Sequence, residues 1–280
     1  MAGSSRRDSP ENAHAGPGHP GSREGDEYMI STTSSGSPSS LSAPGENDPT
    51  RSFLRSLMPF SALSPGGLDE VVRETREIAA EKGHIFFQEG EPSDSVFVVR
   101  SGRVRIQHLH KDGTVRIVCM LAPGDTFCCL PAMDGGRYPA GAVAADRSHV
   151  YRLPASLFRR LMEREPGFAT RTVQHFCGRL RMASCESCWK SQDAPARLAG
   201  KILCMAMKFG DDIPLTRREL GELAGTTVET AIRTIKDFER AGWVQLGRAH
   251  LRVLDRAALA ERSDGAGPLG GAHVQIPVRE

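Results

Sequence analysis

The chain has 280 residues, a net charge of only +2 and an apolar fraction of 39%, which leaves room for two compact domains with polar tails. No apolar run approaches the roughly 18 residues that a membrane-spanning helix needs, and the N-terminal segment lacks the apolar core of a signal peptide. We therefore expect a cytoplasmic protein that does not span a membrane.

Residues 1–50 are rich in serine, glycine and proline and contain almost no large apolar side chains. Such a segment cannot bury enough apolar surface to offset the loss of chain entropy, so we predict a disordered tail. After the tail, residues 53–57 predict a short helix, and a second helix is expected from about Gly66 to Ile78.

The periodicity then changes to short runs in which apolar and polar residues alternate. These runs are interrupted by four glycines, at Gly90, Gly102, Gly113 and Gly124. Short strands with glycine turns at about 8–12-residue spacing are typical of an antiparallel barrel or sandwich. The last strands are expected over residues 140–153, followed by a short helix.

The longest helical pattern covers residues 166–190. Its apolar stripe, at alternating steps of four and three, consists of Ala169, Val173, Phe176, Leu180, Ala183 and Ser187. A heptad seam of this kind suits a parallel partner helix and predicts a homodimer. The alternative is that the stripe packs only against the chain's own barrel.

Residues 215–243, LTRRELGELAGTTVETAIRTIKDFERAGW, predict two helices joined by a tight turn at Gly225. The first helix should run from about Thr216 to Ala224, because Thr216 and Glu219 have the spacing of a capping box. The second should begin at Thr226 or Thr227, where Thr226 and Glu229 repeat that spacing. Its expected buried stripe is Val228, Ala231 or Ile232, Ile235 and Phe238.

The opposite face of the second helix carries Glu229, Thr230, Arg233 and Lys236. A helix-turn-helix points such a face at base edges, where an arginine can bond both acceptors of a guanine and a glutamate can accept from cytosine N4. The alternative is that Glu229 and Arg233 form only an exposed salt bridge, which would contribute ~0.3–0.5 kcal/mol.

The segment GRAHLRVL predicts a hairpin with basic residues Arg248, His250 and Arg252, the wing of a winged helix placed against phosphates. The segment from Pro195 to Glu261 holds 11 Lys and Arg against 9 Asp and Glu, so the prediction of DNA binding rests on local placement of cations. The candidate DNA-binding residues are Thr226, Thr227, Glu229, Thr230, Arg233, Lys236, Arg217 and Arg248.

These motifs resemble the Crp/Fnr superfamily of bacterial transcription regulators over roughly Phe53 to Glu261, most specifically in LTRRELGELAGTTVETAIR. The motifs F-x-EG at 87–90, V-x-SG-x-V at 99–104 and PGD at 123–125 are similar to those of its sensor domain. Val228 before Glu229 is similar to Fnr-type members, whereas Ile232 replaces the serine that they place before the arginine.

The resemblance implies an α+β fold with a jelly-roll barrel, a long dimerisation helix and a winged helix-turn-helix. The expected divisions are a tail over 1–50, the barrel over 51–165, the helix over 166–192, the DNA-binding domain over 193–261 and a flexible tail over 262–280. It also implies a homodimer that reads a palindromic operator through Glu229 and Arg233 and contacts RNA polymerase. The expected function is transcription regulation, not catalysis; the alternative is an effector-binding barrel whose C-terminal domain has lost DNA binding.

The effector is left open between thiol, metal or iron–sulfur cluster chemistry, haem and an organic molecule. Cyclic-nucleotide members hold their ligand with a glutamate and an arginine, whose positions fall near Cys128 and Tyr138; Arg137 is one residue off. Such a shift turns a side chain to the other face, so cyclic AMP is not expected to bind.

The seven cysteines are expected to be free thiols. The candidate effector or redox residues are Cys128, Cys129, Cys177, Cys185 and Cys188, and no metal site is assigned. Adjacent Cys128 and Cys129 should point to opposite faces of an extended segment. The segment GDTFC resembles a haem-binding carbon-monoxide sensor, whereas residues 1–50 lack the cysteine cluster of iron–sulfur sensors.

Overall fold

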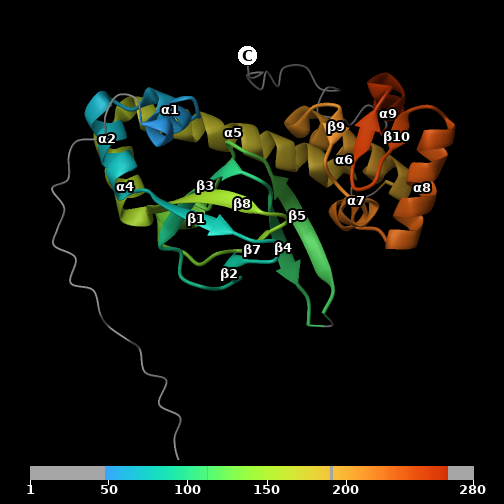
Figure 1. Ribbon diagram of the computed structural model, residues 1–280, viewed down its shortest axis with the longest axis horizontal. Coiled ribbons are helices and arrows are strands. Elements are labelled where there is room, and N and C mark those ends of the chain that lie inside the picture. Colours follow the sequence, from blue (N-terminus) through green and yellow to red (C-terminus); the bar gives the residue numbers. More distant parts are fainter. Residues whose placement is uncertain (1–47, 112, 190–191, 264–280) are drawn as a thin grey trace, which may run out of the picture. The chain divides into compact units, whose positions relative to one another are not determined.

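The computed structural model describes residues 48–111, 113–189 and 192–263 (Figure 1). The described part begins with helix α1 (Pro49–Arg55), the 3-10 helix η1 (Phe60–Ala62) and helix α2 (Pro65–Glu74). Helix α2 is capped by Ser64, whose side chain accepts from the Gly67 N–H. The prediction that this helix reaches Ile78 is wrong, because residues 76–80 pair with a later strand instead.

Eight short strands form two antiparallel four-stranded sheets, as the alternating runs predict. In the first sheet the order is β1-β8-β3-β6, and in the second it is β2-β7-β4-β5. The strands are β1 (Arg76–Ala80), β2 (Ile85–Phe87), β3 (Ser95–Ser101), β4 (Val104–Leu109), β5 (Val115–Leu121), β6 (Thr126–Phe127), β7 (Gly141–Ala144) and β8 (Ser148–Pro154). This arrangement is the predicted jelly-roll barrel.

The central strand β3 is buried on both faces. Val96 and Val98 belong to a core shared with the helices, whereas Phe97 and Val99 belong to the interior of the barrel. The turn after β3 requires glycine, because Gly102 has a φ of 76° and a Cβ there would lie 2.4 Å from the Arg147 carbonyl oxygen. The V-x-SG-x-V motif therefore has a steric origin.

The segment after β6 differs from the prediction. Cys129 begins a short helix, α3 (Cys129–Asp134), and Cys128 is its N-cap with a left-handed φ of 64°. The prediction of an extended segment is therefore wrong. The two thiols nevertheless point to different places, because Cys128 packs against the barrel interior and Cys129 packs into the helical core. A non-glycine residue in this region of φ and ψ is held by its surroundings.

Two helices follow the barrel, α4 (Ala155–Arg164) and α5 (Pro166–Trp189). On the predicted stripe of α5, Val173 is 53% exposed and Leu180 is 70% exposed, while Phe176 packs partly against the helical core. The side chain of Ser187 lies outside the described residues. The stripe is thus not used up by packing against the barrel.

The C-terminal part is a winged helix-turn-helix around its own apolar core. Its elements are α6 (Ala194–Phe209), β9 (Asp212–Ile213), α7 (Arg217–Ala224), α8 (Val228–Arg240), β10 (Val244–Leu246), β11 (Leu251–Val253) and α9 (Arg256–Arg262). The three strands form one antiparallel sheet in the order β10-β11-β9. Helix α9 has no counterpart in the prediction; it packs against α6 through the buried Leu259.

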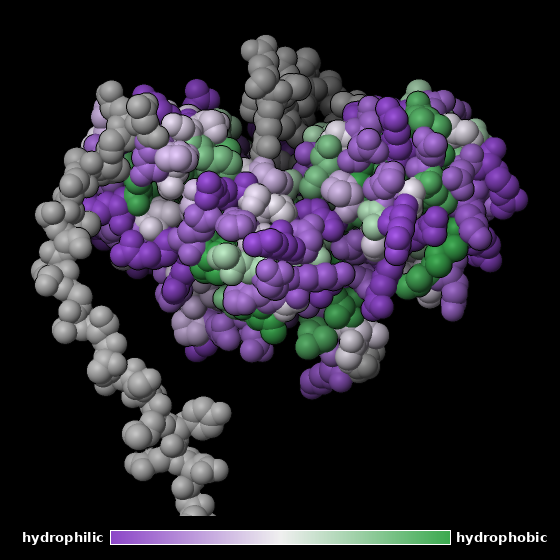
Figure 2. Space-filling view, in the orientation of Figure 1, coloured by the Kyte–Doolittle hydropathy of each residue, from purple (hydrophilic) through white to green (hydrophobic). Residues whose placement is uncertain are grey.

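Hydrophilic residues cover most of the face shown in Figure 2, and hydrophobic residues lie in small groups between them. Within the described ranges, no helix has the length and apolar character needed to cross a lipid bilayer.

Candidate nucleic-acid interface

Helix α7 begins where the capping box predicts. The Thr216 side chain accepts from the Glu219 N–H, and the Glu219 carboxylate accepts from the Thr216 N–H at 2.8 Å. Leu220 and Leu223 are buried, as expected. Gly221 faces α8, where a Cβ would lie 3.0 Å from Ala231, so the absence of a side chain allows the two helices to approach closely.

The turn between α7 and α8 is fixed by its backbone and by an arginine from α6. Gly225 has a φ of 61°, as predicted for the residue that makes the turn. Arg197 Nε donates to the Ala224 carbonyl oxygen at 2.9 Å, and its Nη2 donates to that of Gly225 at 3.2 Å. Sequence reasoning missed Arg197, which lies 27 or more residues before its partners and so has no local signal.

Helix α8 is capped by Thr227, whose side chain accepts from the Thr230 N–H at 3.2 Å. The predicted capping box of Thr226 and Glu229 is therefore wrong by one residue. Of the predicted buried stripe, Ala231, Ile235 and Phe238 are buried, but Val228, the first residue of the helix, is 39% exposed.

The outward face of α8 carries charges without partners. Glu229, Arg233 and Lys236 are exposed, and Thr230 is half-buried. Among the described residues, neither Glu229 nor Arg233 forms a hydrogen bond or ion pair, so the alternative of a salt bridge between them is not observed. These side chains are free to bind something outside the chain.

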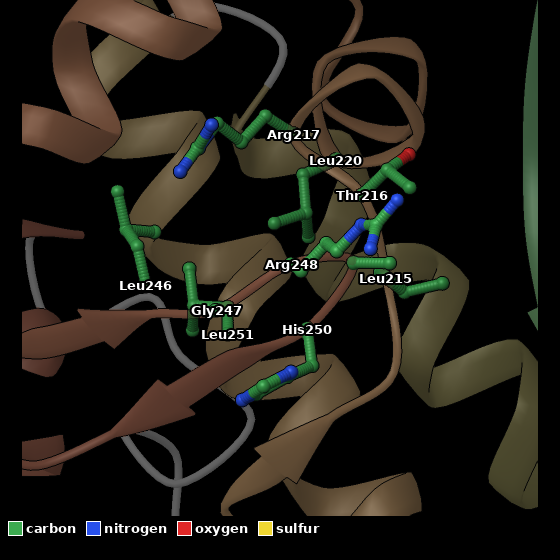
Figure 3. Close-up of a pocket in the computed structure, with 10 residues that line it drawn as sticks. Leu215, Thr216, Arg217, Leu220, Leu246, Gly247, Arg248, His250 and Leu251 are labelled. Atoms are coloured by element: carbon green, nitrogen blue, oxygen red, sulfur yellow. The ribbon is translucent and has the colours of Figure 1, made fainter.

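The wing is the hairpin of β10 and β11. The Leu246 N–H donates to Glu239 on α8 at 2.9 Å, which ties the wing to the second helix. Between the wing and the start of α7 lies a cavity of about 260 Å³. Figure 3 shows Arg217 from α7, and Arg248 and His250 from the wing, among the side chains around it. This cavity joins two elements that a winged helix places near the nucleic-acid backbone.

Within the described residues from 193 to 263, the cations divide into two groups. Those with hydrogen-bond, ion-pair or other electrostatic partners are Arg197, Lys201, Lys208, Arg218, Arg240, Arg256 and Arg262. Those without such partners are Arg217, Arg233, Lys236, Arg248 and Arg252. The unpaired group lies on α8, the start of α7 and the wing.

Of the two adjacent thiols after β6, Cys129 is buried and Cys128 is half-buried. Desolvation raises the pKa of Cys129 to about 12 and also raises that of Cys128, with the neighbouring thiols Cys129 and Cys119 adding to the latter effect. Both cysteines are therefore thiols, not thiolates, at neutral pH. Cys119, which sequence reasoning did not select, packs with Cys128 against the barrel interior.

Of the candidate cysteines on α5, only Cys177 has a described side chain, and it does not join the barrel thiols in a site. Cys177 is exposed, and the side chains of Cys185 and Cys188 lie outside the described residues. Cys119, Cys128, Cys129 and Cys177 are free thiols, as predicted. In the ranges that the structure describes, no group of three or more His, Cys, Asp and Glu could hold a metal ion.

Comparison with known proteins agrees with this architecture. A family model for the cyclic nucleotide-binding domain matches residues 77–165, and one for the Crp-like helix-turn-helix domain matches residues 196–262. The chain is 28% identical over 208 residues to the Cyclic AMP receptor protein of Thermus thermophilus, covering 74% of this chain and 96% of that relative.

Two further proteins are similar over most of their length. The CRP-like cAMP-activated global transcriptional regulator of Mycobacterium tuberculosis is 24% identical over 213 residues, covering 73% of this chain and 95% of the relative. The solved structure of FixK2 from Bradyrhizobium japonicum has a TM-score of 0.61 and 24% identity, covering 67% of this chain and 96% of that one.

The barrel, the helix that follows it and the winged helix-turn-helix define a class of regulators that combine an effector-binding domain with a DNA-binding domain. The chain belongs to the Crp/Fnr family of transcription regulators, which are not enzymes.

Proposed function

We propose that the protein is a homodimer that reads a palindromic DNA site through the outward face of α8 and is switched by an effector at the barrel. The observation that carries this proposal is the exposed, unpaired set of Glu229, Arg233 and Lys236, held outward by the buried Ala231 and Ile235 on the other side of the helix. From the bounds of the strands and helices we also infer domain divisions at residues 51–165, 166–192 and 193–261.

The charges on α8 match the chemistry of base edges. The Arg233 guanidinium can donate two parallel hydrogen bonds to guanine O6 and N7, and the Glu229 carboxylate can accept from cytosine N4. Each such contact discriminates against a wrong base by about 1–3 kcal/mol. Thr226, Thr227 and Thr230 lie at the same end of the helix, where their hydroxyls would contact the backbone or bases.

The cavity beside the wing supports a role in holding the DNA backbone. Arg217 and Arg248 line it from two elements, and neither guanidinium has a partner among the described residues. Contacts between arginines and phosphates set the register of the protein on DNA without reading sequence. We assign Arg217, Arg248 and Lys236 to this sequence-independent part of the binding.

Dimerisation through α5 would place two copies of α8 on a twofold axis. Val173 and Leu180 are large apolar side chains that lie seven residues apart and are more than half exposed. Residues seven apart in a heptad seam face the partner helix. Two recognition helices related in this way would read half-sites one helical turn apart, which is the reason to propose a palindromic operator.

Contacts between the barrel and the C-terminal part support the proposed switch. Lys208 Nζ on α6 lies 2.8 Å from Asp125 Oδ2 and donates to the Met120 carbonyl oxygen at 2.8 Å. Arg103 donates to the Pro214 carbonyl oxygen and lies 3.9 Å from Glu219 on α7. Asp125 lies three residues before Cys128, so a change in that loop would alter the contacts that hold α6 and α7.

We propose that the effector is a molecule other than cyclic AMP, although two of the relatives are named for cyclic AMP. Tyr138, at the position expected for the phosphate-binding arginine, is buried and stacks on Phe87 with 3.8 Å between ring centroids. Arg137 is exposed, and its Nη1 donates to the Gly90 carbonyl oxygen. The effector classes that we retain are thiol, metal or iron–sulfur cluster chemistry, haem and an organic molecule. The candidate thiols of the barrel, Cys128 and Cys129, follow β6 directly.

Selection of duplexes from a random-sequence DNA library by the full-length protein tests the proposal. We expect an enriched palindrome with two half-sites. Light scattering should give the protein that binds it a mass of twice that of one chain. We further propose, from the family resemblance, that the protein acts in the cytoplasm and contacts RNA polymerase at this DNA site. A protein that folds but enriches no sequence would instead be the alternative, an effector-binding barrel without DNA binding.

A further inference from the structure

A second cavity, of about 380 Å³, opens in the barrel where the two sheets meet. Its volume falls in the range of roughly 300–1,000 Å³ that small-molecule sites occupy. Its lining residues come from β1, β2, β3 and β8 and from the loops beside them; they are Ile78, Phe86, Phe87, Glu91, Pro92, Asp94, Phe97, Tyr138 and Arg152. None of the candidate effector thiols is among them.

An irregularity in β2 aims two consecutive aromatic side chains into this cavity. Ile85 pairs with Val143, but Phe87 pairs with Ala142, so the register shifts within the strand. In a regular strand Phe86 and Phe87 would point to opposite faces. Here both approach Phe97, with ring centroids 6.3 and 5.4 Å away, and both line the cavity. Bulges of this kind re-aim side chains and are frequent beside functional sites.

The aromatic side chains form a continuous wall. Phe87 stacks on Tyr138 with an interplanar angle of 21°, and both rings are buried, as is Phe97. Phe86 is half-buried and leaves part of its ring facing the opening. The faces of such rings are electron-rich, so they favour flat apolar ligands and attract cations.

The rim of the cavity carries two carboxylates and one guanidinium. Arg152 is already engaged, because its Nη2 lies 2.8 Å from Asp94 Oδ2 and its Nε donates to Ser95 at 2.7 Å. Burial opposes ionisation of Asp94, but the hydrogen bonds from Ser95 and Arg152 prevail and lower its pKa, so it is ionised at neutral pH.

Glu91 is exposed, and its Oε2 accepts only from the Gln88 N–H. In the part of the chain that the structure describes, Glu91 has no cationic partner. Among the lining residues the carboxylates thus outnumber the guanidinium by two to one, and the Glu91 carboxylate is available to a ligand.

We propose that this cavity binds a small flat aromatic molecule that carries a protonated amine. The ring would lie against Phe86 and Phe97, and the ammonium group would pair with Glu91 at the rim. An anionic ligand is disfavoured, because it would face the carboxylates of Glu91 and Asp94 while Arg152 is already paired. The inference concerns the barrel alone, so it does not depend on the proposed DNA binding.

A ligand here would also contact the loop that carries Cys128 and Cys129. Tyr138 ends that loop, its N–H donates to the Glu91 carbonyl oxygen at 2.9 Å, and its own carbonyl oxygen accepts from the Gly90 N–H at 2.8 Å. The backbone on both sides of the cavity opening is thus joined by hydrogen bonds, which hold Glu91 and Tyr138 in place before any ligand binds.

Titration calorimetry on the full-length protein tests the proposal with three probes of one ring system: tryptamine, indole and indole-3-acetate. We expect saturable binding of tryptamine at one site per chain, weaker binding of indole and the weakest binding of indole-3-acetate. Absence of saturable tryptamine binding, or equal affinity for tryptamine and indole-3-acetate, would overturn the proposal.

Two matched variants locate the site. Glu91→Gln should weaken tryptamine binding about fivefold, the upper end for one exposed ion pair. Glu89→Gln removes an exposed carboxylate two residues earlier, which contacts His108 at 2.9 Å and does not line the cavity, so tryptamine affinity should not change. An equal loss in both variants, or no loss in Glu91→Gln, would contradict the assignment. Both changes are on the surface and leave the core intact.

Discussion

The barrel and the outward face of α8 differ in whether their charged side chains are paired. On the barrel, Arg100 pairs with Glu77 and Arg152 pairs with Asp94, each at 2.8 Å. On α8, Arg233 and Lys236 are exposed and have no partner among the described residues. A paired guanidinium must break its bond before it can bind a phosphate or base, whereas an unpaired one need not. In a chain with a net charge of only +2, unpaired charge marks the interface better than total charge does.

The thiols of the barrel and of α5 differ in burial, and this difference gives the largest expected effect. Cys129 is buried with its pKa raised to about 12, so below that pH it stays protonated, whereas Cys177 on α5 is exposed. A pKa of about 12 in place of the ordinary 9.0 lowers the thiolate fraction of Cys129 about a thousandfold. In alkylation with iodoacetamide at pH 8, followed by peptide mass spectrometry, Cys177 should react first and Cys129 only after unfolding. Rapid labelling of Cys129 in the folded protein would show that the helical core around this thiol opens readily.

Introducing charge on the exposed stripe of α5 should abolish the dimer. Leu180→Asp would place like charges opposite each other across the seam, which costs several kcal/mol, so we expect about a hundredfold or greater loss in dimer affinity. Arg171→Asp is the control. Arg171 lies nine residues before Leu180, and at about 100° per residue this places it on the opposite side of the helix. Sedimentation should show a monomer for the first variant only; a dimer that survives Leu180→Asp would move the interface elsewhere.

Removing the unpaired arginine of α8 should weaken sequence-specific DNA binding. For Arg233→Ala we expect a loss of roughly 30-fold or more for the selected duplex, because the homodimer loses one good base contact in each half-site. Arg240→Ala on the same helix is the matched control, since that arginine is already paired with Asp237. Fluorescence anisotropy measures both. If the two variants lose affinity equally, pairing of the arginines is irrelevant to DNA binding.

An unpaired cation beside the wing should act on all sequences alike. Arg248→Ala should weaken binding to specific and random duplexes by the same factor and reduce the slope of log affinity against log salt by about 1.8, since the homodimer loses one phosphate contact, worth about 0.9, in each protomer. Arg256→Ala, whose guanidinium contacts Asp211 at 2.8 Å, serves as the comparison. An unchanged slope in Arg248→Ala would remove this residue from the interface.

The smallest expected effect distinguishes two adjacent threonines. Thr227→Ala removes the N-cap of α8 and should lower the free energy of unfolding by about 1 kcal/mol. Thr226→Ala should change it little, since no side-chain cap is formed there. Urea denaturation of both variants measures the difference, and the reverse order would restore the capping box expected from the sequence.

Local signals explain which parts of the fold the sequence predicts. Thr216, Glu219 and Gly225 act within a few residues of one another, so the first helix and the turn follow from the sequence. Thr226 and Thr227 are identical in chemistry, and only the backbone decides which one caps α8. Ile78 fits a helical and a strand period equally well, and its pairing with Val150, 72 residues away, decides for the strand.

The functional features that the sequence does not predict depend on distant contacts. Lys208 meets Asp125 across 83 residues, and no pattern in either segment indicates the pair. The cavity in the barrel depends on a register shift in β2, where two adjacent phenylalanines look like an ordinary apolar run. Helix α3 is only six residues long and begins after a left-handed cysteine, so no periodic pattern predicts it.

The most direct test of base reading by α8 is a double-mutant cycle between Arg233 and a guanine in each half-site of the selected duplex. Replacement of the guanine in both half-sites should weaken wild-type binding by roughly 30-fold or more and leave the affinity of Arg233→Ala almost unchanged, because both contacts are already lost. Losses that simply add at every guanine of the half-site would contradict the account, since Arg233 would then read none of them.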